Sequence, residues 1–419
     1  MTHFLVSALG SAGDVHPFIA ISQALRVRGH DVRMIASPHF ADRIRNAGIS
    51  FAAMGAPGDY ERLLQRRELW EPRGGARFIL DELLDRLPEA YAATRALAGE
   101  PQTVLVGSTL AWGMRIVQEA TGLPAATVHL SPVCVQSATA PPILPGVGDL
   151  SWMPSWSLRG MQWAAERLLL DRWIGPRLNG LRATVGLAPV RRIWGRWMHS
   201  PDLVVCAWPS WFAPPQKDWP PQAETSGFPL YDERGAGLDA ALTSFLDAGE
   251  SPIGITAGSA MAHGREFFAK GIAACAEAGR RVVLISPYHD QIPVQLPDWS
   301  HHVAYAPFSA LVPRLSKLIH HGGIGTSAQA LTAGIPQLVV PFAHDQFDNA
   351  KRLTRLGVAR TVALSASTDN WVAAITGLEA ESTVMCVRHY AARMRDGEPA
   401  ADAIARRLEA LALRGVAAH

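Results

Sequence analysis

Short apolar runs alternate with amphipathic stretches along the first 130 residues. A helical pattern over 17–29 carries Pro17 in its first turn, and further helical patterns separate the later runs. The clearest runs are HFLVSAL (3–9), HDVRMIAS (30–37), TVLVG (103–107) and AATVHL (125–130). Because each run is short, apolar and bounded by turn residues, the pattern predicts buried strands in a parallel, doubly wound α/β sheet.

The alternation breaks after residue 130 and then returns. Residues 152–200 are helical in pattern and dense in tryptophan, and 209–229 contains six prolines. Strand-like runs resume at PIGITAGS (252–259), RRVVLIS (280–286), HVAY (302–305), KLIHH (317–321) and QLVVP (337–341). We therefore predict two Rossmann-like domains joined by a proline-rich linker. The predicted ranges are 1–215, a linker over 216–235, 236–380, and 381–419 as helices that return to the first domain.

Composition narrows the class of protein. The chain has 419 residues, 48% of them hydrophobic, and its 39 basic and 37 acidic side chains give no electrostatic case for binding nucleic acid. Four scattered cysteines form no CxxC motif, which is typical of free thiols in a reducing compartment. We find no apolar run near 18 residues and no signal-peptide pattern. We expect a cytoplasmic protein without a membrane span.

The stretch KLIHHGGIGTSAQALTAG predicts a strand, a glycine turn and a helix. Glycines let a ligand approach the backbone, and a helix start offers unpaired N–H groups and the positive end of a dipole, which suits a diphosphate. Thr326 could add a hydroxyl, and His320 a donor that can carry charge. An ordinary turn with glycines needed for packing is the alternative. The chain has no Asp-x-Asp for a metal–diphosphate, so we predict a reaction that needs no metal and no cofactor.

Asp345 and Gln346 follow the next predicted strand, on the sheet edge where ligands bind in open α/β folds. A carboxylate beside an amide can hold adjacent hydroxyl groups of a sugar. Capping of the following helix by Asp345 is the alternative, and from this stretch alone it is the favoured one.

The turn LGSAGDVHP (9–17) does not have the glycine spacing of the dinucleotide fingerprint, and the second strand ends without a ribose-binding acid. A nicotinamide dehydrogenase is therefore disfavoured. Asp14 lies at the carboxyl edge of the first sheet, where it could take a proton from an attacking hydroxyl, with His16 two residues later. Capping of the first helix explains Asp14 equally well.

Together these stretches resemble the family 1 glycosyltransferases of the GT-B fold. GSAGDVHPF is similar to their N-terminal motif, and YAPFSALVPRLSKLIHHGGIGTSAQALTAGIPQLVVPFAHDQ to their donor-binding signature. Within the family the likeness is strongest to the rhamnosyltransferases of mono-rhamnolipid synthesis, through RWMHSPDLVVC, WFAPPQKDWP, TSGFPLYD and HDQFDNAKRL. The resemblance implies Asp14 as general base, with His16 as helper or rival. It also implies donor contacts from Ser259, Tyr305, His320, Gly322, Gly323, Gly325, Thr326, Asp345 and Gln346.

The resemblance further implies inverting transfer of L-rhamnose from dTDP-L-rhamnose to the hydroxyl of a 3-(3-hydroxyalkanoyloxy)alkanoate. UDP-glucose as donor, with a lipid, sterol or polyketide acceptor, is the alternative. The first domain would bind the acceptor and the second the nucleotide sugar. Nine of the 13 tryptophans lie in 152–219, and we expect most to pack between helices. Trp152, Trp156 and Trp163 are assigned to an acceptor pocket.

An apolar face in this segment could also rest on the inner membrane, and a partner enzyme could supply the acceptor. A non-catalytic partner subunit of the same fold is the rival from another class, and a sugar epimerase is a third. A non-catalytic subunit conflicts with the complete set of catalytic positions. An epimerase needs no acceptor pocket, and this chain has a segment suited to one.

Overall fold

The computed structural model describes residues 1–72, 74–100, 102–232 and 237–417. The chain forms two compact units, each with its own parallel sheet. The first unit comprises 1–63, 73–229 and 399–419, and the second comprises 64–72 and 230–398. The α/β fold with two Rossmann-like sheets is therefore confirmed.

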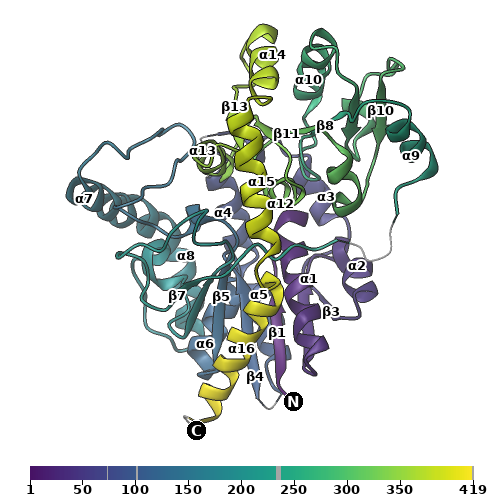
Figure 1. The fold of residues 1–419 in the computed structure, drawn as a ribbon. Helices are drawn as coiled ribbons and strands as arrows, with labels where there is room; N and C mark the ends of the chain where they lie inside the picture. Colours follow the sequence, from purple (N-terminus) through teal and green to yellow (C-terminus); the bar gives the residue numbers. More distant parts are fainter. Residues whose placement is uncertain (73, 101, 233–236, 418–419) are drawn as a thin grey trace. The chain divides into compact units, whose positions relative to one another are not determined.

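The first unit is built on a seven-stranded parallel sheet with the order β3-β2-β1-β4-β5-β6-β7 (Figure 1). Its strands are β1 (His3–Ser7), β2 (Asp31–Ala36), β3 (Ser50–Ala53), β4 (Thr103–Ser108), β5 (Ala125–His129), β6 (Leu203–Cys206) and β7 (Ala223–Thr225). Every residue of β1, β4, β5 and β6 is buried, as expected where helices cover both faces of a parallel sheet.

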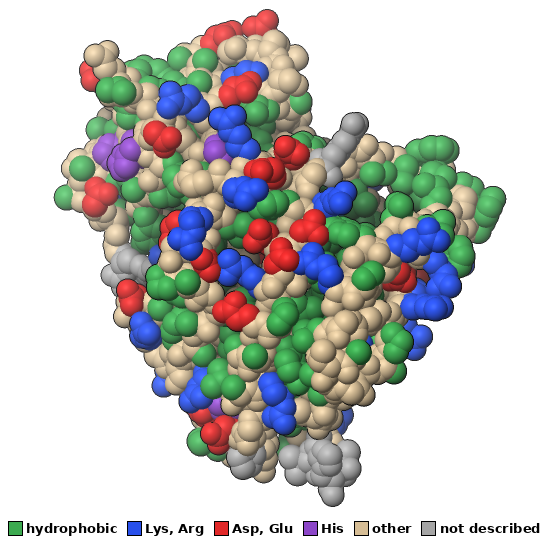
Figure 2. Space-filling model, turned by 180° about the vertical axis from the view of Figure 1, so that it is seen from behind, with side chains coloured by type: hydrophobic (Ala, Val, Ile, Leu, Met, Phe, Trp, Pro, Cys, Tyr) green, Lys and Arg blue, Asp and Glu red, His purple; other side chains and the backbone are tan. Residues whose placement is uncertain are grey.

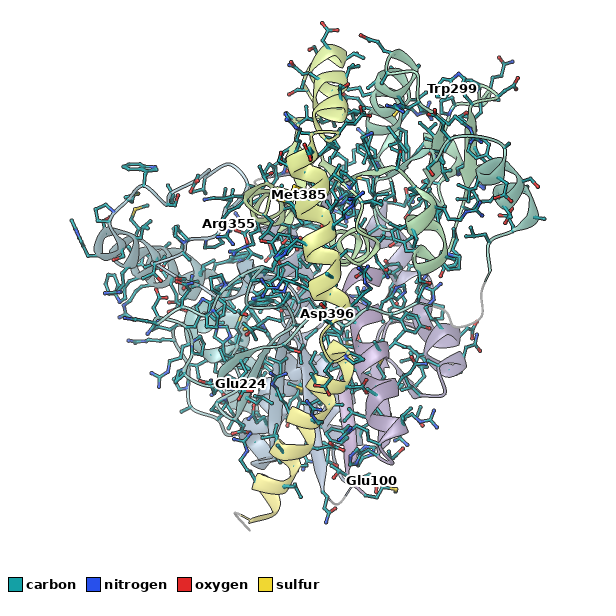
Figure 3. The ribbon with its side chains drawn as sticks, viewed as in Figure 1. Glu100, Glu224, Trp299, Arg355, Met385 and Asp396 are labelled. Atoms are coloured by element: carbon teal, nitrogen blue, oxygen red, sulfur yellow. The ribbon has the colours of Figure 1, made fainter. Side chains whose placement is uncertain are left out.

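A long helical segment lies between β5 and β6 of the first unit. The C-terminal helix α16 packs on α1. Glu409 of α16 binds Arg28 and His30, and Arg407 binds Glu224 of β7, which is labelled in Figure 3. The helices are α1 (Ala12–Val27), α2 (Ala41–Asn46), α3 (Asp59–Leu64), α4 (Gly75–Asp85), α5 (Leu87–Leu97), α6 (Trp112–Thr121), α7 (Ser155–Ala165), α8 (Asp171–Thr184) and α16 (Ala400–Ala417). A π-helical turn, η4 (Glu166–Leu170), joins α7 to α8.

The second unit repeats the plan with six parallel strands in the order β10-β9-β8-β11-β12-β13. The strands are β8 (Ile253–Thr256), β9 (Val282–Ile285), β10 (Ser300–Val303), β11 (Lys317–His320), β12 (Gln337–Val339) and β13 (Ala359–Thr361). The helices are α9 (Ala240–Asp247), α10 (Arg265–Glu277), α11 (Phe308–Leu311), α12 (Ile324–Ala333), α13 (Gln346–Arg355), α14 (Thr368–Gly377) and α15 (Glu381–Arg395). In both sheets the strand order reverses beside the first strand, which is where doubly wound folds bind ligands.

Four expectations need correction. The first helix begins at Ala12 and not at residue 17, so Pro17 lies inside it. The predicted linker 216–235 contains β7, which pairs with β6 and belongs to the first sheet. Residues 64–72 count with the second unit although both flanking segments count with the first. Of the predicted returning segment 381–419, only 399–419 belongs to the first unit, and α15 belongs to the second.

Candidate active site

The turn between β11 and α12 brings backbone and open space together at the switch point of the second unit. Gly322 has φ +94°, in the left-handed region that favours glycine, and Gly323 is the N-cap residue of α12. A Cβ added at Gly325 would meet nothing within 4 Å, so the first turn of α12 is open on that side. The N–H groups of this turn therefore form a ready site for an anion.

His320 is fully buried, and both of its ring nitrogens bond within the protein. The N–H of Gly322 donates to Nδ1 at 3.1 Å, and Nε2 lies 3.0 Å from Oε1 of Gln337. Since Nδ1 accepts a hydrogen bond, the proton sits on Nε2 and is donated to Gln337. Burial, with a smaller effect of neighbouring His321, lowers the pKa of His320 to about 3. In this structure the ring is therefore neutral and holds the turn, and its contact with a diphosphate stays a prediction.

His321 lies between the turn and the loop that follows β8. A Cβ added at Gly258 would stand 2.6 Å from Cε1 of this ring, and one added at Gly323 would stand 2.4 Å from Nε2. The ring thus brings the loop of Ser259, whose carbonyl accepts from the Tyr288 hydroxyl at 3.3 Å, beside the helix start. Nδ1 of His321 is buried without a hydrogen-bond partner among the described residues, and burial lowers the pKa of the ring to about 4.

The pair at the start of α13 is tied to the same turn. Asp345 occupies the N-cap position, yet its side chain makes no capping bond, so the capping interpretation is wrong. Instead Nδ2 of Asn349 donates to Oδ2 of Asp345 at 2.8 Å and to the carbonyl of Gly322 at 2.9 Å. Oε1 of Gln346 accepts from the N–H groups of Phe342 and Ala343. That leaves the amide N–H groups of Gln346 as its means of holding a sugar hydroxyl.

Asp14 lies at the switch point of the first unit, at the third position of α1. Its Oδ2 accepts from the backbone N–H of Ser11 at 2.7 Å and from the Ser11 hydroxyl at 2.9 Å. Gly10, with φ +127°, keeps room for this carboxylate, since an added Cβ would stand 2.4 Å from Oδ2. Asp14 therefore caps the first helix, as one of the two interpretations expected. Capping does not exclude chemistry, because a carboxylate offers about four acceptor positions.

His16 is held by Arg43, whose Nη1 donates to Nε2 of the ring at 3.0 Å. Burial, then the charge of Arg43, lowers the pKa of His16 to about 3. A neutral imidazole has one nitrogen with an available lone pair, and here that nitrogen accepts from Arg43. This arrangement makes His16 a poor general base and favours Asp14 for that role.

Comparison with known proteins identifies the family. Residues 4–139 match the glycosyltransferase family 28 N-terminal domain, and 273–411 match the erythromycin biosynthesis protein CIII-like C-terminal domain. The chain is 30% identical over 416 residues to O-mycaminosyltylonolide 6-deoxyallosyltransferase of Streptomyces fradiae, covering 91% of this chain and 90% of the relative. The chain belongs to the family 1 GT-B glycosyltransferases.

Two further comparisons agree with this assignment. The glycosyltransferase is 30% identical over 357 residues to vancomycin aglycone glucosyltransferase of Amycolatopsis orientalis, with 84% of each chain covered. The solved structure of spinosyn rhamnosyltransferase SpnG complexed with thymidine diphosphate shares the fold, with a TM-score of 0.67 and 21% identity over 98% of this chain and 100% of that chain. The chain is thus a sugar-transferring enzyme related to macrolide and glycopeptide glycosyltransferases. These relatives support the family and not the narrower expectation of rhamnolipid synthesis.

Thr326 lies in the first turn of α12, whereas the predicted tyrosine and tryptophans of the glycosyltransferase are exposed. Tyr305 follows the edge strand β10 and is half exposed. Trp152, Trp156 and Trp163 have exposed fractions of 77%, 74% and 56%, so they do not line an enclosed pocket in this structure. These three tryptophans are also exceptions to the expectation that most tryptophans of 152–219 pack between helices, because their side chains are exposed.

Two residues that sequence reasoning passed over belong to the site of the glycosyltransferase. His321 is absent from the predicted site residues, although its buried Nδ1 lacks a hydrogen-bond partner among the described residues. Asn349 links Asp345 to the glycine turn, and its spacing of four residues from Asp345 on one helix was a usable signal.

Proposed function

We propose that this enzyme transfers a 6-deoxyhexose from a dTDP-activated donor, with inversion, to the hydroxyl of an apolar, polyketide-like acceptor. The observation that carries the proposal is the anion site at the start of α12, where Gly325 leaves the first helical turn open and the ring of His321 lies beside Gly323. The names of the relatives support the sugar and the acceptor, since one is a 6-deoxyallosyltransferase of a tylonolide. The SpnG structure with thymidine diphosphate supports the nucleotide.

In the proposed reaction Asp14 removes the proton of the acceptor hydroxyl, and the oxygen attacks the anomeric carbon opposite the diphosphate. The bond from that carbon to the diphosphate oxygen breaks as the new glycosidic bond forms. The N–H groups at the start of α12, with Thr326 and His321, stabilise the charge that develops on the diphosphate. Asp345 and Gln346 hold hydroxyls of the sugar, and no metal or cofactor takes part.

Rhamnosyl transfer from dTDP-L-rhamnose to a 3-(3-hydroxyalkanoyloxy)alkanoate is the second candidate. The exposed apolar residues near Trp156 favour it, because such an acceptor partitions into membranes. One sugar hydroxyl or methyl group changes selectivity by only ~1–3 kcal/mol in a pocket, so the donor has to be found by assay.

The test is a matrix of donors and acceptors with product mass read by mass spectrometry, run with and without EDTA. The donors are dTDP-L-rhamnose, dTDP-glucose and UDP-glucose, and the acceptors are a macrolide aglycone and the hydroxyalkanoyloxyalkanoate. A deoxyhexosyl adduct of the macrolide supports the main proposal, and one of the lipid supports the second candidate. A glucosyl adduct from UDP-glucose alone would overturn both donor assignments, and loss of activity in EDTA would overturn metal independence.

A further inference from the structure

An apolar surface lies on the segment from residue 152 to the end of η4, in the first unit. We call it the α7 surface, and its exposed members are Trp152, Trp156, Met161, Trp163, Leu168 and Leu169. Figure 2 shows hydrophobic side chains gathered at the right-hand edge, over α7, with basic side chains beside them. Isolated exposed apolar residues are normal, but six large ones within 18 residues mark an interaction surface.

The π-helical turn η4 carries the last two exposed residues of this surface, Leu168 and Leu169. Glu166, at its start, is buried and accepts from the backbone N–H of Gly195 at 2.6 Å, with Arg192 at 3.4 Å. This anchor fixes the inner side of the turn, whereas Leu168 and Leu169 are exposed. π-Turns inside helices are frequent at functional sites.

The segment that carries the surface is strongly basic, and the acids Asp81 and Asp85 of neighbouring α4 are paired with Arg177. Residues 152–200 hold eight arginines and two acids, a formal charge of +6 in a chain whose total is +2. Both acids bind groups of the protein itself. Glu166 is buried, and Asp171 accepts from the backbone N–H groups of Arg192 and Ile193 at 2.9 and 3.1 Å. Arg159, Arg167 and Arg172 are exposed on the same segment.

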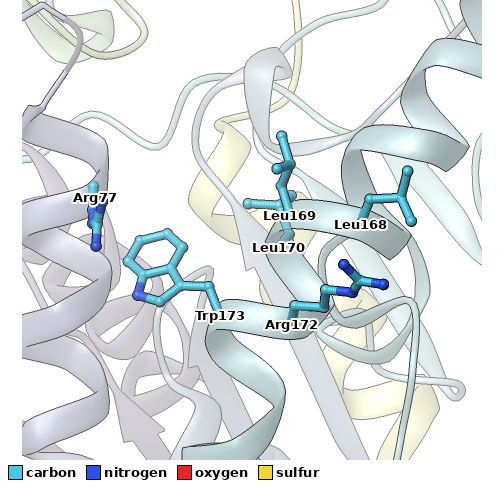
Figure 4. A pocket seen from close by; sticks show the side chains of 6 residues that line it. All are labelled: Arg77, Leu168, Leu169, Leu170, Arg172 and Trp173. Carbon is cyan, nitrogen blue, oxygen red and sulfur yellow. The ribbon is translucent and has the colours of Figure 1, made fainter.

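A hollow of about 370 Å³ opens beside the exposed leucines (Figure 4). Leu168, Leu169, Leu170 and Trp173 supply its apolar walls, and Arg77 and Arg172 also line it. The guanidinium of Arg77 lies over the Trp173 ring, 5.4 Å from its centroid. An apolar hollow with two cations suits an acyl chain whose head group is anionic.

We propose that the α7 surface binds the interface of an anionic lipid bilayer. Tryptophan favours the membrane interface, and a helix with apolar and arginine-rich faces lies in that plane. A second copy of the chain is a poor occupant, because two surfaces of the same positive sign repel each other. The described residues include no helix long and apolar enough to cross a membrane, and the proposed contact is peripheral.

The test is vesicle flotation of the full chain, which measures no turnover and so does not depend on the proposed reaction. Vesicles of phosphatidylcholine are compared with vesicles that contain 30% phosphatidylglycerol, in low and high salt. The variant M161E/L169E places two acids on the surface. Its matched control is V294E/M385E, which makes the same charge change at exposed apolar residues of the second unit (Met385 is labelled in Figure 3). A second variant, R159Q/R167Q/R172Q, removes charge and no apolar area.

We expect the wild type to float with anionic vesicles, less with neutral ones, and less in high salt. M161E/L169E should bind at least tenfold more weakly, while V294E/M385E stays within twofold of the wild type. The triple arginine variant should lose about a hundredfold on anionic vesicles only, at about fivefold per charge. Absence of wild-type flotation, or an equal loss in the matched control, would overturn the proposal. So would a wild-type dimer, in light scattering, that M161E/L169E converts to a monomer.

Discussion

Replacement of Asp14 by Asn separates the two roles that the structure gives this side chain. The carboxylate caps α1 by accepting from the N–H and hydroxyl of Ser11. Asn keeps an oxygen at the same place and can still accept from the Ser11 N–H. It cannot take a proton from an acceptor hydroxyl. The variant therefore preserves the cap and removes the base.

The two effects differ enough in size to be told apart. Loss of a negative charge in the first helical turn costs ~0.3–1 kcal/mol of unfolding free energy. For a domain of ~150–250 residues, this lowers Tm by at most about 4 °C. Loss of a general base lowers kcat by about 10²–10⁴, which corresponds to ~3–5 kcal/mol of activation free energy. A variant that folds and binds nucleotide but does not turn over would therefore identify chemistry.

The assay measures kcat by product mass, Tm by calorimetry and thymidine diphosphate affinity by titration. We expect Asp14→Asn to lose at least a hundredfold in kcat while nucleotide affinity changes less than twofold. The companion His16→Gln should retain more than a tenth of the activity, since His16 is neutral and accepts from Arg43. Full activity in Asp14→Asn, with His16→Gln inactive, would refute the assignment and make His16 the base.

Four further predictions concern the second unit. Gly325→Ala should raise the unfolding free energy by ~0.5–1 kcal/mol, because the position is helical and open. The same variant should lower the affinity for thymidine diphosphate. Unchanged affinity would show that this face of α12 is not part of the phosphate site. Gly322→Ala should destabilise the unit, because φ is +94° there. Burial lowers the pKa of His320 from 6.5 to about 3, so the unfolded chain binds more protons and stability falls as pH drops below 6.5. In urea denaturation His320→Gln should remove ~2 kcal/mol of the loss in unfolding free energy between pH 6.5 and 5. A pH dependence equal to that of the wild type would contradict a neutral buried ring. Asn349→Ala should weaken sugar-donor binding more than nucleotide binding, and an equal effect on both would limit Asn349 to holding the turn.

Strands were predictable to within a few residues because continuous apolar runs are typical of strands buried on both faces. The start of α1 was missed although Ser11 and Asp14 have the spacing of a capping box. β7 has no apolar pattern, and its place comes from pairing with β6. The association of 64–72 with the second unit is likewise a tertiary effect that local sequence does not encode. For Trp156, the helical spacing indicates on which face of the helix the side chain lies. It does not indicate whether another element covers that face.

Asp14 and His320 show why the same inference from sequence has different outcomes. Asp14 follows β1 and His320 ends β11, and each of these strands lies where the order of its sheet reverses. Each side chain is hydrogen-bonded to the turn beside it. A carboxylate can accept from Ser11 and still accept a proton, because it offers about four acceptor positions. A neutral imidazole has one acceptor and one N–H, and in His320 these are used by Gly322 and Gln337. We therefore propose proton transfer for Asp14, whereas both ring nitrogens of His320 hold the glycine turn. Stabilisation of the leaving diphosphate is then proposed for the start of α12.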